Sequence, residues 1–151
     1  MIKPEIRKLN ILIILFTLSI TSFCTKHEFY YFVKAKEDEP FVIIFDHPNG
    51  DSADYSKKRI EYHVPQNGIL FLESREPGSE NVKMHFFYQK NNEWTEMPRD
   101  KMRLRVGEFL FNSDTKTYVT AHFFFPENSH KKMNDKSMIE MLEKAKREDV
   151  Q

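Results

Sequence analysis

Short apolar runs, each closed by turn-forming residues, make up the middle of the chain. The run Phe41–Phe45 is entirely apolar, rich in aromatic and β-branched residues, and preceded by a proline. A run this short is more typical of a buried strand than of a helix. Residues 59–64 alternate between polar and apolar side chains, which predicts a strand with one buried face. Turns are predicted at residues 48–50 and 67–68, where proline, asparagine and glycine tolerate sharp changes in chain direction.

The same criteria apply to the rest of the chain up to residue 126. We expect an edge strand at residues 29–33, where the apolar pattern is short and a charged segment follows. Residues 102–106 predict a half-buried strand, and Gly107 is expected to break it before a short apolar segment at 108–111. Further strands are predicted at residues 69–72, 82–89, 94–97 and 117–125, with 82–89 and 94–97 forming a hairpin.

The hydrophobic period changes near the C-terminus. Met138, Ile139, Met141, Leu142 and Ala145 follow helical spacing, which predicts one amphipathic helix over residues 135–147. Asn134 or Asp135 is the expected N-cap. A helix packed on the sheet is the simplest interpretation of this stripe, and a partner-binding helix is the alternative.

These elements predict a mostly β fold. We expect an antiparallel β-sandwich of about seven or eight strands closed by a C-terminal α-helix, with a partly open β-barrel as the alternative. The 151 residues are divided into a signal peptide at 1–23, a lipid-attachment site and tether at 24–39, the sandwich at 40–130, and the helix and tail at 131–151.

The N-terminal segment has the layout of an export signal. A basic start is followed by a short apolar stretch at residues 9–20 and then by small polar residues. The stretch is shorter than the 20 or so residues that span a bilayer, although an uncleaved anchor is an alternative. Cys24, the chain's one cysteine, lies where bacterial lipoproteins carry their acylated cysteine. We therefore expect an exported, membrane-anchored bacterial lipoprotein; the alternative is a soluble secreted or periplasmic protein.

Charge argues against nucleic acid as a partner. The whole chain has a formal net charge of zero, and the part after residue 23 is slightly acidic. Nucleic-acid binding depends on clustered basic residues that neutralise phosphates, and the composition offers no such excess. The expected partners are the membrane, through the lipid anchor, and another envelope protein.

The central stretch resembles a family of small bacterial secreted or lipoprotein domains of unknown function. The likeness covers roughly residues 33–98, and its most specific part is the Val-Pro-Gln-Asn-Gly-Ile-Leu segment at 64–70. Members share a Val/Ile-rich strand, a Gly/Pro turn and an aliphatic-Pro-x-Asn/Asp-Gly-Ile-Leu segment. This resemblance implies a fold and no catalytic activity.

Two candidate ligand sites emerge from the remaining residues. Asp46, Asp51 and Asp54 flank the turn at 48–50 and could bind calcium, although their spacing is not that of an EF-hand. Trp94, with Tyr88 and Tyr118, could form an aromatic platform for a sugar. The six histidines lack the close pairing of zinc sites, so we predict no metal centre and no cofactor.

Local sequence contains no catalytic motif. There is no Gly-x-Ser-x-Gly elbow, no His-Glu-x-x-His and no glycine-rich phosphate loop, so we assign no catalytic residue. The leading hypothesis is a non-catalytic binding or structural module at the cell envelope. The alternatives are an envelope-associated hydrolase, which would need a histidine and a carboxylate meeting in a cleft, and a sugar- or calcium-binding domain.

Overall fold

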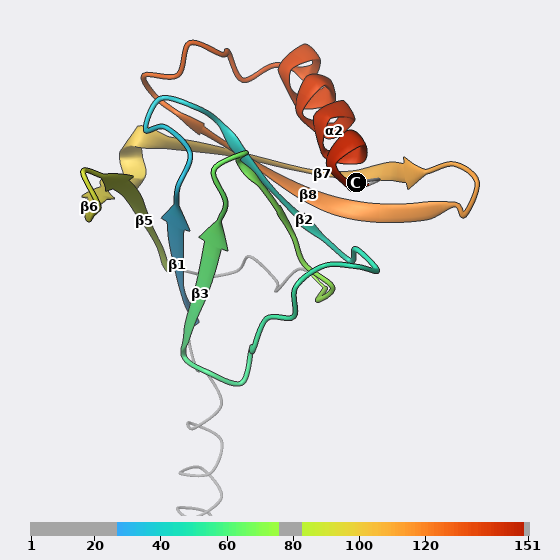
Figure 1. Cartoon of the computed structure of the whole chain (residues 1–151), viewed down its shortest axis with the longest axis horizontal. Helices are drawn as coiled ribbons and strands as arrows, with labels where there is room; N and C mark the ends of the chain where they lie inside the picture. The colour runs from blue at the N-terminus through green and yellow to red at the C-terminus, as the bar shows by residue number, and fades with distance from the viewer. Residues whose placement is uncertain (1–26, 76–82, 150–151) are drawn as a thin grey trace, which may run out of the picture.

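The computed structural model describes residues 27–75 and 83–149 (Figure 1). The predicted signal peptide and Cys24 lie outside the described residues. The described residues form eight strands, a short 3-10 helix and one α-helix. Their bounds are β1 Glu28–Val33, β2 Phe41–Phe45, β3 Arg59–Val64, β4 Ile69–Phe71, β5 Lys83–Lys90, β6 Glu93–Met97, η1 Arg99–Lys101, β7 Met102–Asn112, β8 Thr117–Pro126 and α2 Asp135–Asp149.

The strands form two four-stranded sheets. Sheet A has the order β3-β1-β5-β6, and sheet B has the order β4-β2-β8-β7. Figure 1 shows the strands of sheet A crossing those of sheet B steeply, with α2 packed on sheet B alone. The predicted sandwich with a C-terminal helix is therefore confirmed, and the sheets do not close into a barrel.

The expectation that the sheets are antiparallel throughout is wrong. β1 pairs in parallel with both β3 and β5, and β2 pairs in parallel with β4. The cause is the path of the chain, which alternates between sheets A and B from β1 to β5. A strand that returns to a sheet after one pass through the other sheet runs in its original direction. Antiparallel pairing is confined to β5 with β6, β2 with β8, and β7 with β8.

β1 is a central strand and not the predicted edge strand. It lies between β3 and β5 and forms ladders on both sides. Its alternate residues Phe29, Tyr31 and Val33 are buried in the core between the sheets. Residues 28–33, which the sequence division placed in the tether, thus belong to the sandwich.

Gly107 does not break β7, which continues from Met102 to Asn112 opposite β8. The ring of Phe109 lies over Gly107, and a Cβ added there would come 2.7 Å from the ring. Because only a glycine leaves this space, the residue makes room for an aromatic side chain within an intact strand. A register shift near Leu110 and Asn112 adjusts the pairing further along.

β2 is buried on both faces, as the unbroken apolar run predicts. Phe41, Ile43 and Phe45 point into the core between the sheets. Val42 and Ile44 point the other way, into the layer between sheet B and α2. All five are at most 1% exposed. A strand covered on both sides needs no polar face, which explains its composition.

α2 completes that second layer. Met138, Met141, Leu142 and Ala145 pack against sheet B as the helical spacing predicts. Ile139, the fifth residue of the predicted stripe, is exposed instead. Asn134 is the N-cap: its side-chain oxygen accepts a hydrogen bond from the Ser137 backbone N–H at 2.9 Å. The helix runs two residues beyond the predicted end.

A buried histidine joins the end of α2 to the loop after β2. His47 is 1% exposed, and its Nδ1 accepts a hydrogen bond from the Asn49 N–H at 3.3 Å. That bond places the ring proton on Nε2, which lies 3.3 Å from a carboxylate oxygen of Asp149. The contact supports the position of the helix on sheet B.

Because two core tyrosines are buried, we expect the protein to lose stability at alkaline pH. Burial raises the pKa of the hydroxyls of Tyr62 and Tyr88 well above their ordinary value of 10.0. Below about pH 10 both states keep the tyrosines neutral; above it only the unfolded state ionises. The free energy of unfolding should then fall by about 1.4 kcal/mol per pH unit for each tyrosine.

Urea denaturation between pH 8 and 11 measures this slope. Tyr88→Phe should make the slope above pH 10 shallower by up to about 1.4 kcal/mol per pH unit, because the contribution of that tyrosine is removed. It should also leave neutral-pH stability unchanged or raised, because the Tyr88 hydroxyl has no hydrogen-bond partner among the described residues. An unchanged slope in this variant would contradict the assignment.

Candidate binding surface

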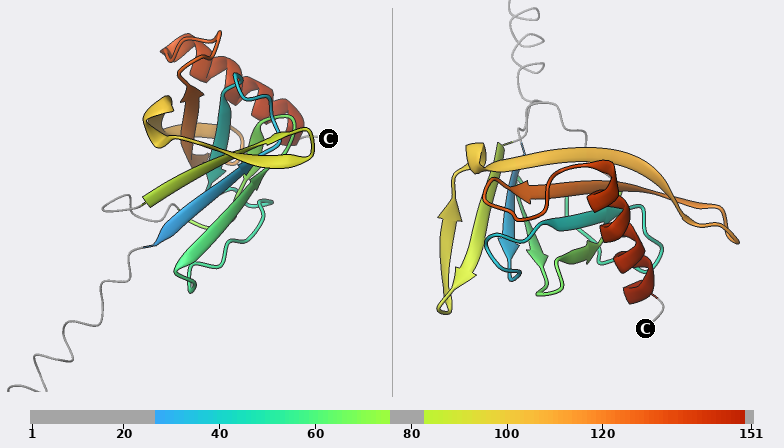
Figure 2. Two further views of the ribbon diagram at one scale, coloured as in Figure 1. Left: turned by 90° about the vertical axis from the view of Figure 1, so that its left-hand side faces the viewer. Right: turned by 90° about the horizontal axis from the view of Figure 1, so that it is seen from above.

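The outer face of sheet A carries a layer of aromatic side chains. We call this layer the aromatic face. Figure 2 shows sheet A from its outer side in the left panel, with α2 away from it. The residues of β1, β3 and β5 lie on one side of the sheet because they alternate with the buried residues of those strands, and Trp94 of β6 joins them through its pairing with Gln89. Its members are Tyr30, Phe32, His63, His85, Phe87 and Trp94.

The rings of the aromatic face stack on one another across the strands. Phe32 is the hub: it stacks on His63 and on Phe87, each with ring centres 5.1 Å apart. Tyr30 stacks on His85 at 4.6 Å. Because the flat faces of these rings pack against one another, the ring edges point outward. Trp94 is different, since it meets Phe32 edge-on at 5.2 Å and is 39% exposed.

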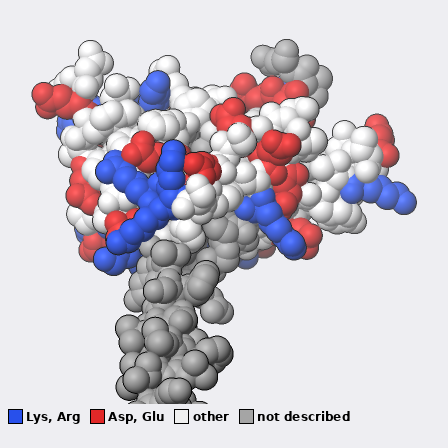
Figure 3. All heavy atoms as spheres, turned by 90° about the horizontal axis from the view of Figure 1, so that it is seen from below, with Lys and Arg blue, Asp and Glu red and all other residues white. Residues whose placement is uncertain are grey.

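Charged side chains surround these rings. The Arg59 guanidinium lies over the Tyr30 ring, 4.1 Å from its centre, and its Nε is 2.7 Å from a carboxylate oxygen of Glu61. Burial, and then a hydrogen bond to Glu28, raises the pKa of the Tyr30 hydroxyl. Seen from below, basic side chains lie beside acidic ones (Figure 3). The rim therefore offers contacts of both signs.

The two sheets differ in what covers them. α2 seals the outer face of sheet B over Val42, Ile44 and Phe123. No element among residues 27–75 and 83–149 packs on the outer face of sheet A, which is built from half-buried and exposed side chains. Exposed apolar patches rimmed by polar groups are typical of interaction surfaces.

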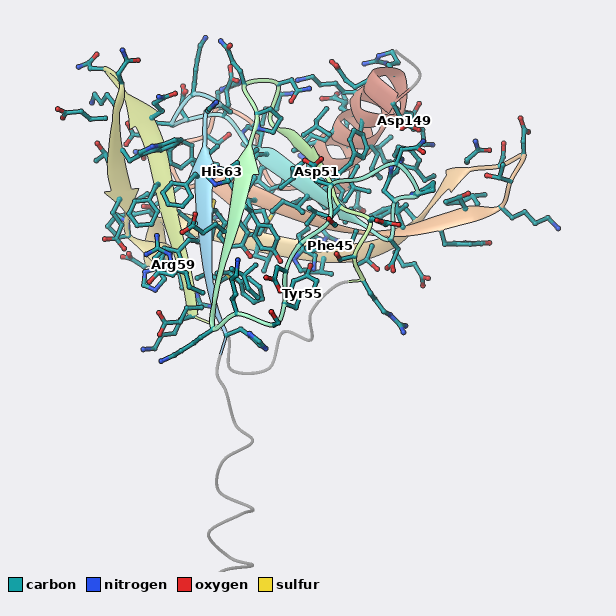
Figure 4. The ribbon with its side chains drawn as sticks, turned by 60° about the horizontal axis from the view of Figure 1, so that its bottom comes forward. Phe45, Asp51, Tyr55, Arg59, His63 and Asp149 are labelled. Carbon is teal, nitrogen blue, oxygen red and sulfur yellow. The ribbon has the colours of Figure 1, made fainter. Side chains whose placement is uncertain are left out.

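A cleft of about 780 Å³ lies beside the free edge of β3. Figure 4 shows His63 and Asp51, which belong to its two walls. His63 and Glu61 both line the cleft, with Nε2 and Oε2 3.7 Å apart. That distance exceeds hydrogen-bond reach, and Glu61 is already paired with Arg59, so the pair is a poor acid–base unit. His63 and Glu61 therefore do not give this cleft the histidine–carboxylate pair that a hydrolase site would need.

The three carboxylates proposed for calcium do not form a metal-binding group. All three are exposed, and within the described ranges no three His, Cys, Asp or Glu side chains gather in a way that could hold a metal ion. Asp54 accepts hydrogen bonds from the Ser56 backbone and hydroxyl, and these bonds lower the pKa of its carboxyl. Asp46 and Asp51 follow β2 and serve the turn geometry at that end of the strand.

Trp94 is on the candidate surface, but its predicted neighbours are not. Tyr88 points into the core between the sheets, and Tyr118 is exposed on β8 of sheet B. The true neighbours come from β1 and β5. The missed signal was the second face of each alternating strand: residues 30 and 32, and residues 85 and 87, are aromatic at positions that a solvated face would fill with polar side chains.

No helix among residues 27–75 and 83–149 is both long and apolar enough to cross a bilayer.

Comparisons with known proteins add a fold relationship. No known family model matches the chain, and no curated protein is detectably similar. A 2.75 Å crystal structure described as "Putative Lipoprotein from Bacillus anthracis" is similar, with a TM-score of 0.60. The match covers 80% of this chain and 94% of that chain at 6% sequence identity. At this identity the likeness shows a shared fold.

Proposed function

We propose that the protein is an exported, lipid-anchored bacterial envelope protein that binds another envelope protein through the aromatic face. One observation carries the binding role: α2 covers the outer face of sheet B over Val42, Ile44 and Phe123, while the outer face of sheet A keeps a half-buried aromatic layer with no described element over it. An apolar layer of this kind is stabilised when a partner removes it from water.

The geometry of the rings favours a protein over a sugar. Several sugar rings would need several exposed aromatic faces, and here the faces of Tyr30, Phe32 and Phe87 are turned to one another. Ring edges, one exposed tryptophan and a rim of mixed charge suit protein side chains, since tryptophan, tyrosine and arginine are enriched at the centres of protein interfaces. Trp94 and Arg59 are the expected anchors.

The anchor would keep the aromatic face close to the membrane. Cys24 precedes the first residue of β1 by four residues. Four residues span at most about 14 Å, so an acylated cysteine would hold the base of sheet A near the lipid surface. The lipid anchor is supported by the fold shared with the crystal structure described as "Putative Lipoprotein from Bacillus anthracis" and by the export-signal pattern of residues 1–23.

The anchor has a direct test. Full-length protein expressed in a Gram-negative host should carry acyl chains on Cys24, so its intact mass after membrane extraction should exceed that of the processed polypeptide. Cys24→Ala removes the thiol that accepts the lipid, so the variant should lose the added mass. It should also lose membrane retention, because stable anchoring needs acyl chains. An unacylated wild-type product, or an uncleaved one, would refute the lipid anchor.

The binding role has a separate test. A photo-reactive residue replacing Gln89, which pairs with Trp94, should form a discrete adduct with one envelope protein in cells. Trp94→Ala in the same chain should abolish that adduct. The variant should fold normally, since Trp94 is 39% exposed on an edge strand and its removal should cost about 1 kcal/mol or less.

The matched control is the same photo-reactive residue replacing Ile139. This side chain is 56% exposed on α2, away from sheet A, so it should give no such adduct. Equal adducts at both positions, or none at position 89, would contradict a binding role for the aromatic face.

A further inference from the structure

The free edge of β3 presents backbone hydrogen-bonding groups to the cleft. β3 is the last strand of sheet A and, within the described residues, pairs with β1 alone. The carbonyls of Lys58 and Val64 accept hydrogen bonds from β1 at 2.8 and 3.0 Å. In a parallel ladder alternate residues face the same neighbour. The backbone N–H and C=O groups of Arg59, Glu61 and His63 therefore point away from β1, toward the cleft.

The cleft has the size and shape that this edge needs. Its volume of about 780 Å³ lies in the ordinary range for binding clefts. One wall is β3 itself, and the opposite wall is the segment between β2 and β3, including Asp51 and Asp54. The backbone N–H and C=O groups along the free edge of β3 alternate as donors and acceptors beside this cleft. An extended polypeptide backbone is the ligand that matches such a row.

The side chains around the cleft define the sequence of that polypeptide. Leu70 and Leu72, buried members of the core between the sheets, line the inner side of the cleft. The side chains of Arg59, Glu61 and His63 lie on the outer side and are exposed. Successive residues of a strand point to opposite sides. An inserted strand would place every second residue against the leucines and the others beside these charged groups.

We propose that the cleft binds an extended peptide segment of a partner protein, with alternating apolar and polar residues, which adds to sheet A as a strand beside β3. The contact is by strand addition: backbone hydrogen bonds to β3 supply general affinity, and the apolar positions supply selectivity. This inference depends on β3 and its cleft, and it does not require the aromatic face or the lipid anchor to have the role proposed above.

A proline at the middle of β3 tests the proposal. The Glu61 N–H points away from β1, so Glu61→Pro removes an outward donor without removing a hydrogen bond to β1. Glu61→Ala is the matched control, since it removes the same side chain and keeps the N–H. Circular dichroism and urea denaturation of both full-length variants establish that each is folded.

The probe is a library of short linear peptides displayed on phage and selected against the full-length wild-type protein. Selected peptides should alternate apolar and polar residues and bind both wild type and Glu61→Ala. They should bind Glu61→Pro about tenfold more weakly than Glu61→Ala, the effect of losing about 1.4 kcal/mol of binding free energy. Peptides without alternation, no selected peptides, or equal binding to the proline variant would overturn the proposal.

Methylated peptides provide a test that does not depend on folding of the proline variant. Methylation of those peptide nitrogens that would face β3 should abolish binding to wild type. Methylation of the alternate nitrogens, which face away, should have little effect. Equal effects of the two methylation sets would overturn strand addition. Trp94→Ala should leave peptide binding unchanged, so failure here is distinct from failure of the aromatic-face proposal.

Discussion

The burial of β2 on both faces is the constraint on which the rest of the structure depends. Three of its side chains fill the core between the sheets, and two fill the layer under α2. Complete burial of five such residues contributes on the order of 10 kcal/mol to folding, before the cost of conformational entropy. The two layers are coupled, because one strand supplies side chains to both.

This arrangement also decides which surface remains for binding. α2 has one apolar stripe, and that stripe is used on sheet B. Sheet A therefore has a buried inner face and an outer face over which no described element lies. The parallel pairing places β3 at an edge beside the loop that follows β2, and so creates the cleft next to the aromatic face. Both candidate surfaces thus follow from the route of the chain between the sheets.

Local patterns were sufficient to predict most elements. The apolar run of β2, the alternation in β3 and the helical stripe of α2 each depend on neighbouring residues alone, and all three are confirmed. Strand order and direction depend on contacts between distant segments. For this reason the central place of β1 and the parallel pairs could not be read from the sequence. The prediction that Gly107 breaks its strand was wrong, because the residue instead leaves space for the ring of Phe109.

The candidate site was harder to predict than the fold. Trp94 was recognised as a large aromatic residue, but its partners Phe32 and Phe87 lie on strands far away in the sequence. Alternation identifies two faces of a strand without showing which one is covered. Because β1 and β5 carry aromatic residues on both faces, their sequences are typical of strands buried on both sides. Within residues 27–75 and 83–149 one of those faces is uncovered, since α2 packs on sheet B.

Hydrogen exchange of the β2 amides is the most direct test of this account. If β2 is locked between two layers, the amides of Val42 to Phe45 should exchange only by global unfolding, with a free energy equal to that from urea denaturation. Leu142→Ala, which removes a contact of α2 with sheet B, should lower both values equally, by about 2–4 kcal/mol. Two results would contradict the central role of this strand. One is exchange of the β2 amides through a local opening of lower free energy, and the other is an exchange free energy that Leu142→Ala leaves unchanged.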